Sequence, residues 1–293
     1  MSDFSLSIIV KKDIEKDISL ILDEFYNQKS DHFKKRIIRF YKSLESKIGE
    51  NPNKEKETVE NFFREIYRDK QEQIDKIIEE SDAILKNQAQ DCLAILAGLM
   101  DYKMDKNEEF IAIPTLLPFS PFNRPIFNFS IVSPLFLKEE NEILDIAIHE
   151  ISHFMLFDIL KNLNINLWGD TEQRNFLHLF KEALTGMLLS EEQMEKLLGR
   201  KGYQGNPEVC DLYIKDEKIG EVILGEYLRI QLYDHKKNNL SFFDFIKDMI
   251  EKLSPQIKEF SEKKIFWDKN ERELKGKNVS LDLLEEYKKP IFV

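Results

Sequence analysis

Two histidines and a glutamate within residues 141–161 have the types and the spacing that suit metal chemistry. The five residues His149-Glu150-Ile151-Ser152-His153 follow the pattern H-E-x-x-H. In an α-helix, residues four apart lie on one face a single turn from each other, so both imidazoles can bind one ion. Neutral imidazole is a good zinc ligand, and a glutamate beside the ion can take a proton from a water that zinc activates. The pattern therefore predicts one Zn²⁺ held by His149 and His153, with Glu150 as the general base.

The residues around this pattern favour a buried helix. Between Ile146 and Phe157, Glu150 is the single charged residue, and no proline or glycine interrupts the run. Such a segment is typical of a helix that packs on most of its surface. Burying two histidines without a partner is costly, and this cost favours the metal site. The alternative interpretation is a pair of hydrogen-bonded core histidines beside a solvated glutamate.

The H-E-x-x-H helix is followed by a second helix that carries glutamates, and one of these could complete the site. A catalytic zinc usually takes three protein ligands and keeps one position open. This arrangement resembles the gluzincin metallopeptidases, the thermolysin-like and aminopeptidase-like enzymes, over roughly residues 109–190. Glu172 follows His153 with eighteen residues between them, a spacing that many gluzincins use. Glu182 lies in Lys181-Glu182-Ala183-Leu184-Thr185-Gly186, which is similar to the Asn-Glu-Gly/Ala element of the family.

Burial separates the two candidate ligands better than spacing does. Glu172 lies in the first turn of a helix whose start is marked by Asp170, and there the helix dipole stabilises an acid by about 0.3–1 kcal/mol. Glu182 lies in the middle of the strongly apolar run 175–189, where a carboxylate is costly unless it is paired. We therefore expect Glu182 to be the third ligand, with Glu172 as the alternative.

Gluzincins also use a downstream tyrosine or histidine to polarise the tetrahedral intermediate, and the resemblance implies such a residue here. Tyr227, His235 and Tyr203 are candidates, and the sequence does not choose among them. His178 is a further candidate, because it lies one turn before Glu182 on the same helix face. An ordinary half-buried histidine is the simpler interpretation of His178.

The chain departs from the thermolysin-like pattern at one position. Those enzymes carry an aspartate four residues after the ligand glutamate, where it supports the metal site, and this chain has Gly186 there. Asp145 or Asp158, which flank the motif by about a turn, could take over that role.

Hydrophobic periodicity predicts a mostly helical α+β chain in two parts. In residues 1–105, the helical N-terminal region, apolar residues recur at three- and four-residue steps, with a break at 49–52. The densely charged stretch 54–87 is predicted to be a long solvated helix, and a partner-binding arm is the alternative. Residues 106–293 are expected to form the zincin-like metallopeptidase domain that the resemblance implies. Further helices are predicted at 170–190, 191–198, 218–233, 241–253 and 256–267.

Residues 109–113 and 126–132 are predicted to be short strands. Prolines bracket the second strand, as expected at the edge of a sheet: Pro121, Pro125 and Pro134. Zincins bind substrate as an extra strand along such an edge, so the resemblance implies that a peptide pairs with Asn128, Phe129 and Ser130. The alternative is an inner strand, with neighbours supplied by 109–113 and by a segment that the sequence does not reveal.

Composition limits the partners and the compartment. The net charge of −11 argues against nucleic acid or an anionic membrane as a partner through bulk electrostatics. Cys92 and Cys210 are far apart in sequence, so neither a disulfide framework nor a Cys-rich zinc site is expected. The N-terminal apolar run is too short for a signal peptide, and no run reaches the roughly 18 apolar residues of a membrane span. The expected location is the cytoplasm.

The sequence thus predicts a zinc-dependent metallopeptidase that hydrolyses a peptide or protein substrate. Two alternatives remain open. One is a degenerate zincin or helical scaffold that acts as a protein-binding module, and the other is a metal amidohydrolase with a non-peptide substrate.

Overall fold

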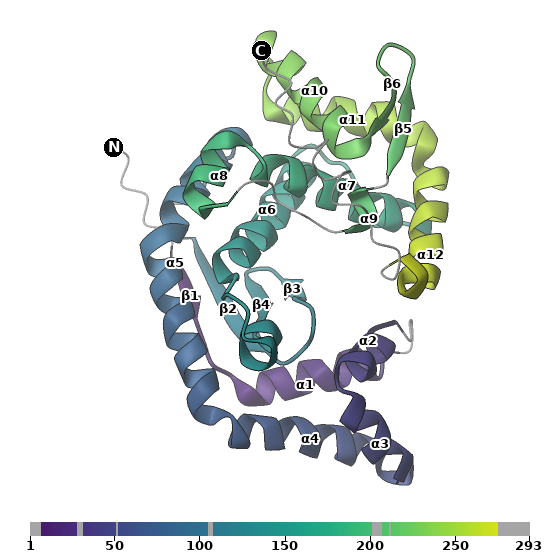
Figure 1. The fold of residues 1–293 in the computed structure, drawn as a ribbon. Coiled ribbons are helices and arrows are strands. Elements are labelled where there is room, and N and C mark those ends of the chain that lie inside the picture. The colour runs from purple at the N-terminus through teal and green to yellow at the C-terminus, as the bar shows by residue number, and fades with distance from the viewer. Residues whose placement is uncertain are drawn as a thin grey trace. The chain divides into compact units, whose positions relative to one another are not determined.

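A computed structural model describes residues 7–27, 32–50, 52–104, 108–200, 207–210 and 212–274. The chain is mostly helical with small sheets, as predicted (Figure 1). It divides into two compact units. The first holds Met1–Gln90 and Asp105–Glu150, and the second holds Asp91–Met104 and Ile151–Val293. This division differs from the boundary predicted near residue 105, because the strands that follow residue 105 belong to the same unit as the N-terminal helices.

The first unit contains a four-stranded sheet with the order β1-β2-β4-β3. Its strands are β1 (Ser7–Val10), β2 (Glu109–Thr115), β3 (Phe122–Asn123) and β4 (Ile126–Ser130). Both β1 and β4 pair with β2 in parallel, and β3 pairs with β4 as an antiparallel neighbour. The predicted strands correspond to β2 and β4, whereas β1 and β3 were not predicted. The pairing of β1 with β2 joins residues 7–10 to residues 109–112 and explains why they share a unit.

The prediction that the strand before the metal helix has a free edge is wrong. β4 is an inner strand, because β2 lies on one side and the chain that leads into β3 lies on the other. The Asn128 amide N–H donates to Pro121 O at 2.8 Å, and the Asn128 side-chain amide donates to the same oxygen at 3.0 Å. The Ser130 N–H donates to Ser120 Oγ at 3.2 Å. The backbone of Asn128, Phe129 and Ser130 is therefore not an open edge for a substrate peptide.

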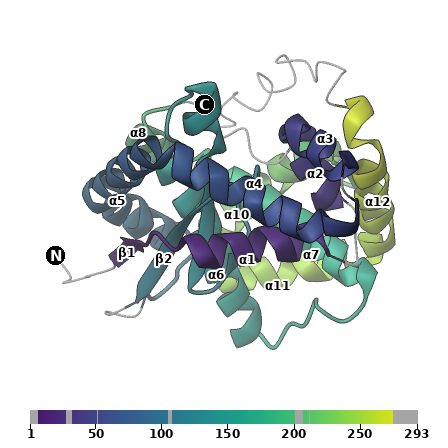
Figure 2. The same ribbon diagram turned by 90° about the horizontal axis from the view of Figure 1, so that it is seen from below.

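Five helices lie between β1 and β2 along the chain, and the first of them contacts β2. They are α1 (Ile14–Phe25), α2 (His32–Phe40), α3 (Lys42–Glu50), α4 (Glu55–Asp69) and α5 (Gln71–Leu99). The predicted break at 49–52 separates α3 from α4. The charged stretch 54–87 is two helices instead of one, since α4 ends before Lys70. Figure 2 shows α1 beside α4, and Val59, Phe63 and Tyr67 bury one face of α4.

A buried carboxylate connects these helices to the sheet. Asp17 on α1 is fully buried. Its Oδ2 accepts hydrogen bonds from Tyr67 Oη at 2.7 Å and from the Leu116 N–H at 3.1 Å. Tyr41, between α2 and α3, donates from its Oη to Leu116 O at 2.7 Å, so the residue that follows β2 is bound both from α1 and from Tyr41. A short π-helical turn, Ser133–Leu137, then leads from β4 towards α6 (Ile143–Asn162).

The second unit is organised around α7 (Thr171–Leu189), most of whose residues from Phe176 onward are buried. Asp170 caps α7, because its side chain accepts the Gln173 N–H at 2.8 Å. Both α10 (Leu224–Lys237) and α12 (Ile257–Leu274) pack against α7. The other helices are α8 (Glu192–Leu198), α9 (Pro207–Cys210) and α11 (Phe242–Leu253). The four-residue helix α9 was not predicted. The other helices agree with the predicted ranges, with one exception.

The exception is the predicted helix at 218–233, whose first residues are in a β-hairpin. Strand β5 (Tyr213–Asp216) pairs with β6 (Gly220–Ile223), and α10 begins only at Leu224. The Asp216 carboxylate accepts the N–H groups of Lys218 and Ile219, and Gly220 has a φ of 88°, which closes the turn. Among the described helices, none is long and apolar enough to cross a membrane.

Candidate metal centre

Helix α6 presents both histidines and Glu150 from one continuous segment. The helix runs from Ile143 to Asn162, as the apolar pattern predicted. His149 and His153 lie one turn apart on it. His149 is 9% exposed, Glu150 7% and His153 1%, so these polar groups are enclosed by protein.

Helix α7 supplies the third candidate ligand. Glu182 is 6% exposed in the middle of α7, whereas Glu172 is exposed in the first turn. One ligand atom from each of His149, His153 and Glu182 lies within 4.8 Å of the others. This is the group that could hold a metal ion in the parts of the chain that the structure describes, and Glu172 does not belong to it.

The donor set, and the spacing of one ligand pair, fit a zinc-sized ion. Two imidazoles and one carboxylate are a common ligand set for catalytic zinc. Bonds of about 2.0–2.2 Å in a tetrahedral site separate neighbouring ligand atoms by roughly 3.3–3.6 Å. His153 Nε2 and Glu182 Oε1 are 3.4 Å apart, so this pair already has the spacing that a shared ion requires.

Hydroxyl groups fix the orientation of His153. Thr185 Oγ1 lies 3.2 Å from His153 Nδ1, and Ser152 Oγ lies 2.6 Å from Thr185 Oγ1. An imidazole that donates from Nδ1 to a hydroxyl keeps its lone pair on Nε2, which is the nitrogen that faces Glu182. Thr185 thus supports His153, a kind of role for which the sequence suggested an aspartate.

The two aspartates proposed for that role, Asp145 and Asp158, lie on α6 about one turn before and after the motif. Asp158 accepts a hydrogen bond from Tyr102 Oη at 2.5 Å, and Asp145 is in the first turn of the helix. Thr185 was not predicted, because the thermolysin-like pattern places the supporting residue at Gly186, the next position. A hydroxyl one turn after Glu182 in an otherwise apolar helix is the signal that could have identified it.

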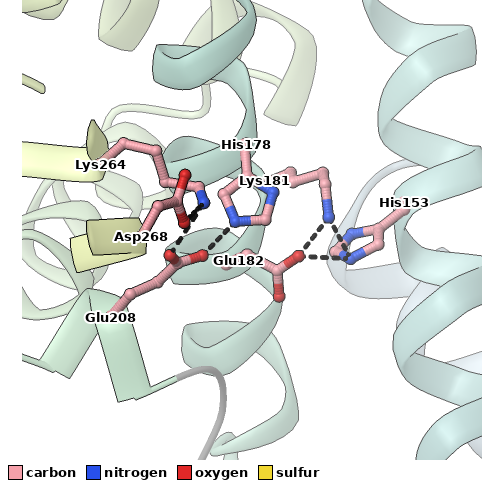
Figure 3. Close-up of polar contacts among 7 residues, drawn as sticks. All are labelled: His153, His178, Lys181, Glu182, Glu208, Lys264 and Asp268. Carbon is pink, nitrogen blue, oxygen red and sulfur yellow. Dashed lines mark hydrogen bonds and ion pairs between the residues drawn. The ribbon is translucent and has the colours of Figure 1, made fainter. Parts of the chain in front are cut away.

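Lys181 is the second residue at this site that the sequence did not reveal. Its Nζ lies 3.0 Å from His153 Nε2 and contacts Glu182 Oε1 (Figure 3). The Lys181 side chain is 11% exposed. A lysine next to a glutamate in the middle of an apolar helix is itself a signal, because an ammonium group is buried only when it is paired.

His178 belongs to a neighbouring charged cluster (Figure 3). His178 Nε2 bonds to Glu208 on α9, and Lys264 on α12 lies 3.4 Å from Glu208 Oε2 and 2.5 Å from Asp268. Burial raises the pKa of the Glu208 carboxyl, but the hydrogen bond from His178 and the charges around it, Lys264 included, hold that pKa below its usual value. His178 therefore connects α7 to α9 through its contact with Glu208.

The downstream tyrosine and histidine candidates are engaged by other groups. Tyr227 Oη donates to Asp216 at 3.3 Å, and burial with the nearby Asp216 charge raises the Tyr227 pKa to about 12. His235 contacts Gln231 O through Nδ1 at 2.8 Å and Asp248 through Nε2 at 2.9 Å. These contacts serve the packing of α10 and give no support for a role at the metal centre. Tyr203 lies outside the described residues.

Comparison of the chain with protein-family models, curated proteins and solved structures finds no match in any of the three.

Proposed function

We propose that this chain is a zinc-dependent hydrolase that cleaves peptide bonds. The observation that carries the proposal is the buried group of His149, His153 and Glu182, whose ligand atoms converge within 4.8 Å, with Glu150 next to the first ligand. Polar groups of this kind are costly to bury, and a shared metal ion offsets that cost. The choice of peptides rests on the resemblance of the motif to the gluzincins.

Zinc bound by these three residues would act as a Lewis acid and would lower the pKa of a water molecule, which supplies the nucleophile. Glu150 would take the proton from this water and pass it to the leaving nitrogen. Its position on α6, beside His149, holds it near the ligands without making it one. Thr185 keeps the His153 ring turned so that Nε2 faces the site. Enclosure of these groups limits the access of bulk water, which strengthens their electrostatic effects.

Substitution of Glu150 by glutamine tests this assignment. The amide has the same size but cannot act as a base, so Glu150→Gln should retain zinc and lose hydrolysis by at least about 10²-fold, the usual range of general-base catalysis. Zinc content is measured by elemental analysis, and cleavage of a mixed peptide library is followed by mass spectrometry.

The matched control is Glu172→Gln, which makes the same charge change at an exposed position of α7. The control should keep both zinc and activity. Equal activity in Glu150→Gln and the unmodified chain would refute the role of Glu150, and so would loss of activity in both variants to the same degree.

A further inference from the structure

Lys181 places a positive charge against two of the proposed metal ligands. Its Nζ is 3.0 Å from His153 Nε2 and also contacts Glu182 Oε1, while those two ligand atoms are 3.4 Å from each other (Figure 3). All three side chains are buried. The ammonium group therefore lies where a cation would have to approach this pair.

The contact with His153 uses the electron pair that a metal would need. An ammonium group has donors and no acceptor, so the hydrogen bond from Lys181 must end on a lone pair of Nε2. A zinc–nitrogen bond of about 2.0–2.1 Å uses the same lone pair. An imidazole nitrogen has one such pair, so Lys181 and a metal ion cannot both bind Nε2.

The contact with Glu182 adds to this competition. A carboxylate in a buried helix is stabilised by an adjacent ammonium group, and a hydrogen bond between the two charged groups is among the stronger ones in proteins. A divalent ion at Glu182 must replace this interaction. It must also tolerate the lysine charge nearby or push the side chain away.

We propose that Lys181 is a built-in competitor for the metal, so that its ammonium group stabilises the ligands in the metal-free protein and must be displaced when a divalent cation binds. This inference rests on the proposed metal centre and concerns its affinity, not its catalysis. It implies that the chain binds zinc more weakly than its three ligands alone would, and that loading requires a rearrangement of Lys181.

Zinc affinity in variants of Lys181 tests the inference. The dissociation constant is measured on the full chain by competition with a fluorescent zinc chelator at one fixed pH. Lys181→Gln removes the charge and keeps a hydrogen-bond donor for Glu182, and Lys181→Met removes both. Each variant should bind zinc at least about tenfold more tightly than the unmodified chain, because a charge-assisted contact no longer has to be broken. Lys161→Gln is the control, because Lys161 is exposed on α6 and its substitution makes the same charge change.

A second readout covers a variant that folds poorly without metal. Saturating zinc should raise the unfolding temperature more in the Lys181 variants than in the Lys161 variant, because the metal then compensates Glu182 in place of the missing ammonium group. If the unmodified chain binds zinc and the Lys181 variants bind it no more tightly, the inference is wrong and the metal centre stands. If no form of the chain binds zinc, the metal centre itself fails and the inference falls with it.

Discussion

Asp17 gives a pH dependence of stability whose size follows from the structure. Burial raises the pKa of its carboxyl from an ordinary value of 3.8 to about 6, although hydrogen bonds from Thr115, Tyr67 and Leu116 work in the opposite direction. A raised pKa in the folded state means that the folded chain holds this proton more tightly than the unfolded chain does. Stability from this group is therefore complete below about pH 4 and is lost as the pH rises through about 6.

The difference of about 2 pKa units corresponds to roughly 3 kcal/mol, at 1.36 kcal/mol for each unit. Asp17→Asn removes the titration and keeps a side-chain oxygen that can accept from Tyr67 Oη and from the Leu116 N–H. The free energy of unfolding of the variant, minus that of the unmodified chain, should therefore rise by roughly 3 kcal/mol between pH 4 and pH 7.5. Taking this difference cancels the titration of the other carboxylates.

Urea unfolding followed by circular dichroism at 222 nm measures this difference, because the first unit is rich in helix. Asp23→Asn is the matched control, since Asp23 is exposed on the same helix and loses the same charge. Its difference from the unmodified chain should stay nearly constant over the same pH range. A constant difference for Asp17→Asn as well, or one that falls with rising pH, would refute the reasoning about this buried carboxyl.

Three further predictions concern α7. Glu182→Gln should weaken zinc binding strongly, whereas Glu172→Gln should leave the affinity unchanged, as measured by chelator competition; equal effects would remove Glu182 from the ligand set. Thr185→Val should lower zinc affinity by roughly 10–100-fold, because it removes the group that orients His153, and an unchanged affinity would show that Thr185 has no such role. Asp170→Ala should lower the free energy of unfolding by about 1 kcal/mol through loss of the helix cap, while a change near zero in urea unfolding would contradict that contact.

The candidate ligands could be predicted from sequence because their signal is local. The four-residue spacing of His149 and His153 fixes their common helix face without any knowledge of the fold. Glu182 was selected over Glu172 by the cost of burying a carboxylate, and the structure places Glu182 in the group of three and Glu172 at the surface. The contacts of Lys181 and Thr185 could not be predicted from local spacing, because they depend on how α7 lies against His153.

Helices could be predicted from sequence where the amphipathic pattern is long. The prediction failed for strands that pair with segments distant in the sequence. The helices from α7 to α12 follow their apolar repeats, apart from the unpredicted four-residue α9 and the hairpin before α10. Strand β1 is four residues long, and its partner β2 lies about a hundred residues further on. No local sequence pattern therefore indicates their pairing. The two-residue strand β3 is too short to recognise, and it changes β4 from an edge strand into an inner one.

Zinc stoichiometry is the most direct test of the central claim. The full chain is stripped of metal, dialysed against a small excess of zinc at neutral pH and analysed for zinc per chain, together with the double variant His149→Ala, His153→Ala. The metal centre predicts one tightly held zinc ion in the unmodified chain and none in the folded double variant, because two of the three ligands are missing. No retained zinc in the unmodified chain, or equal zinc in both proteins, would contradict it.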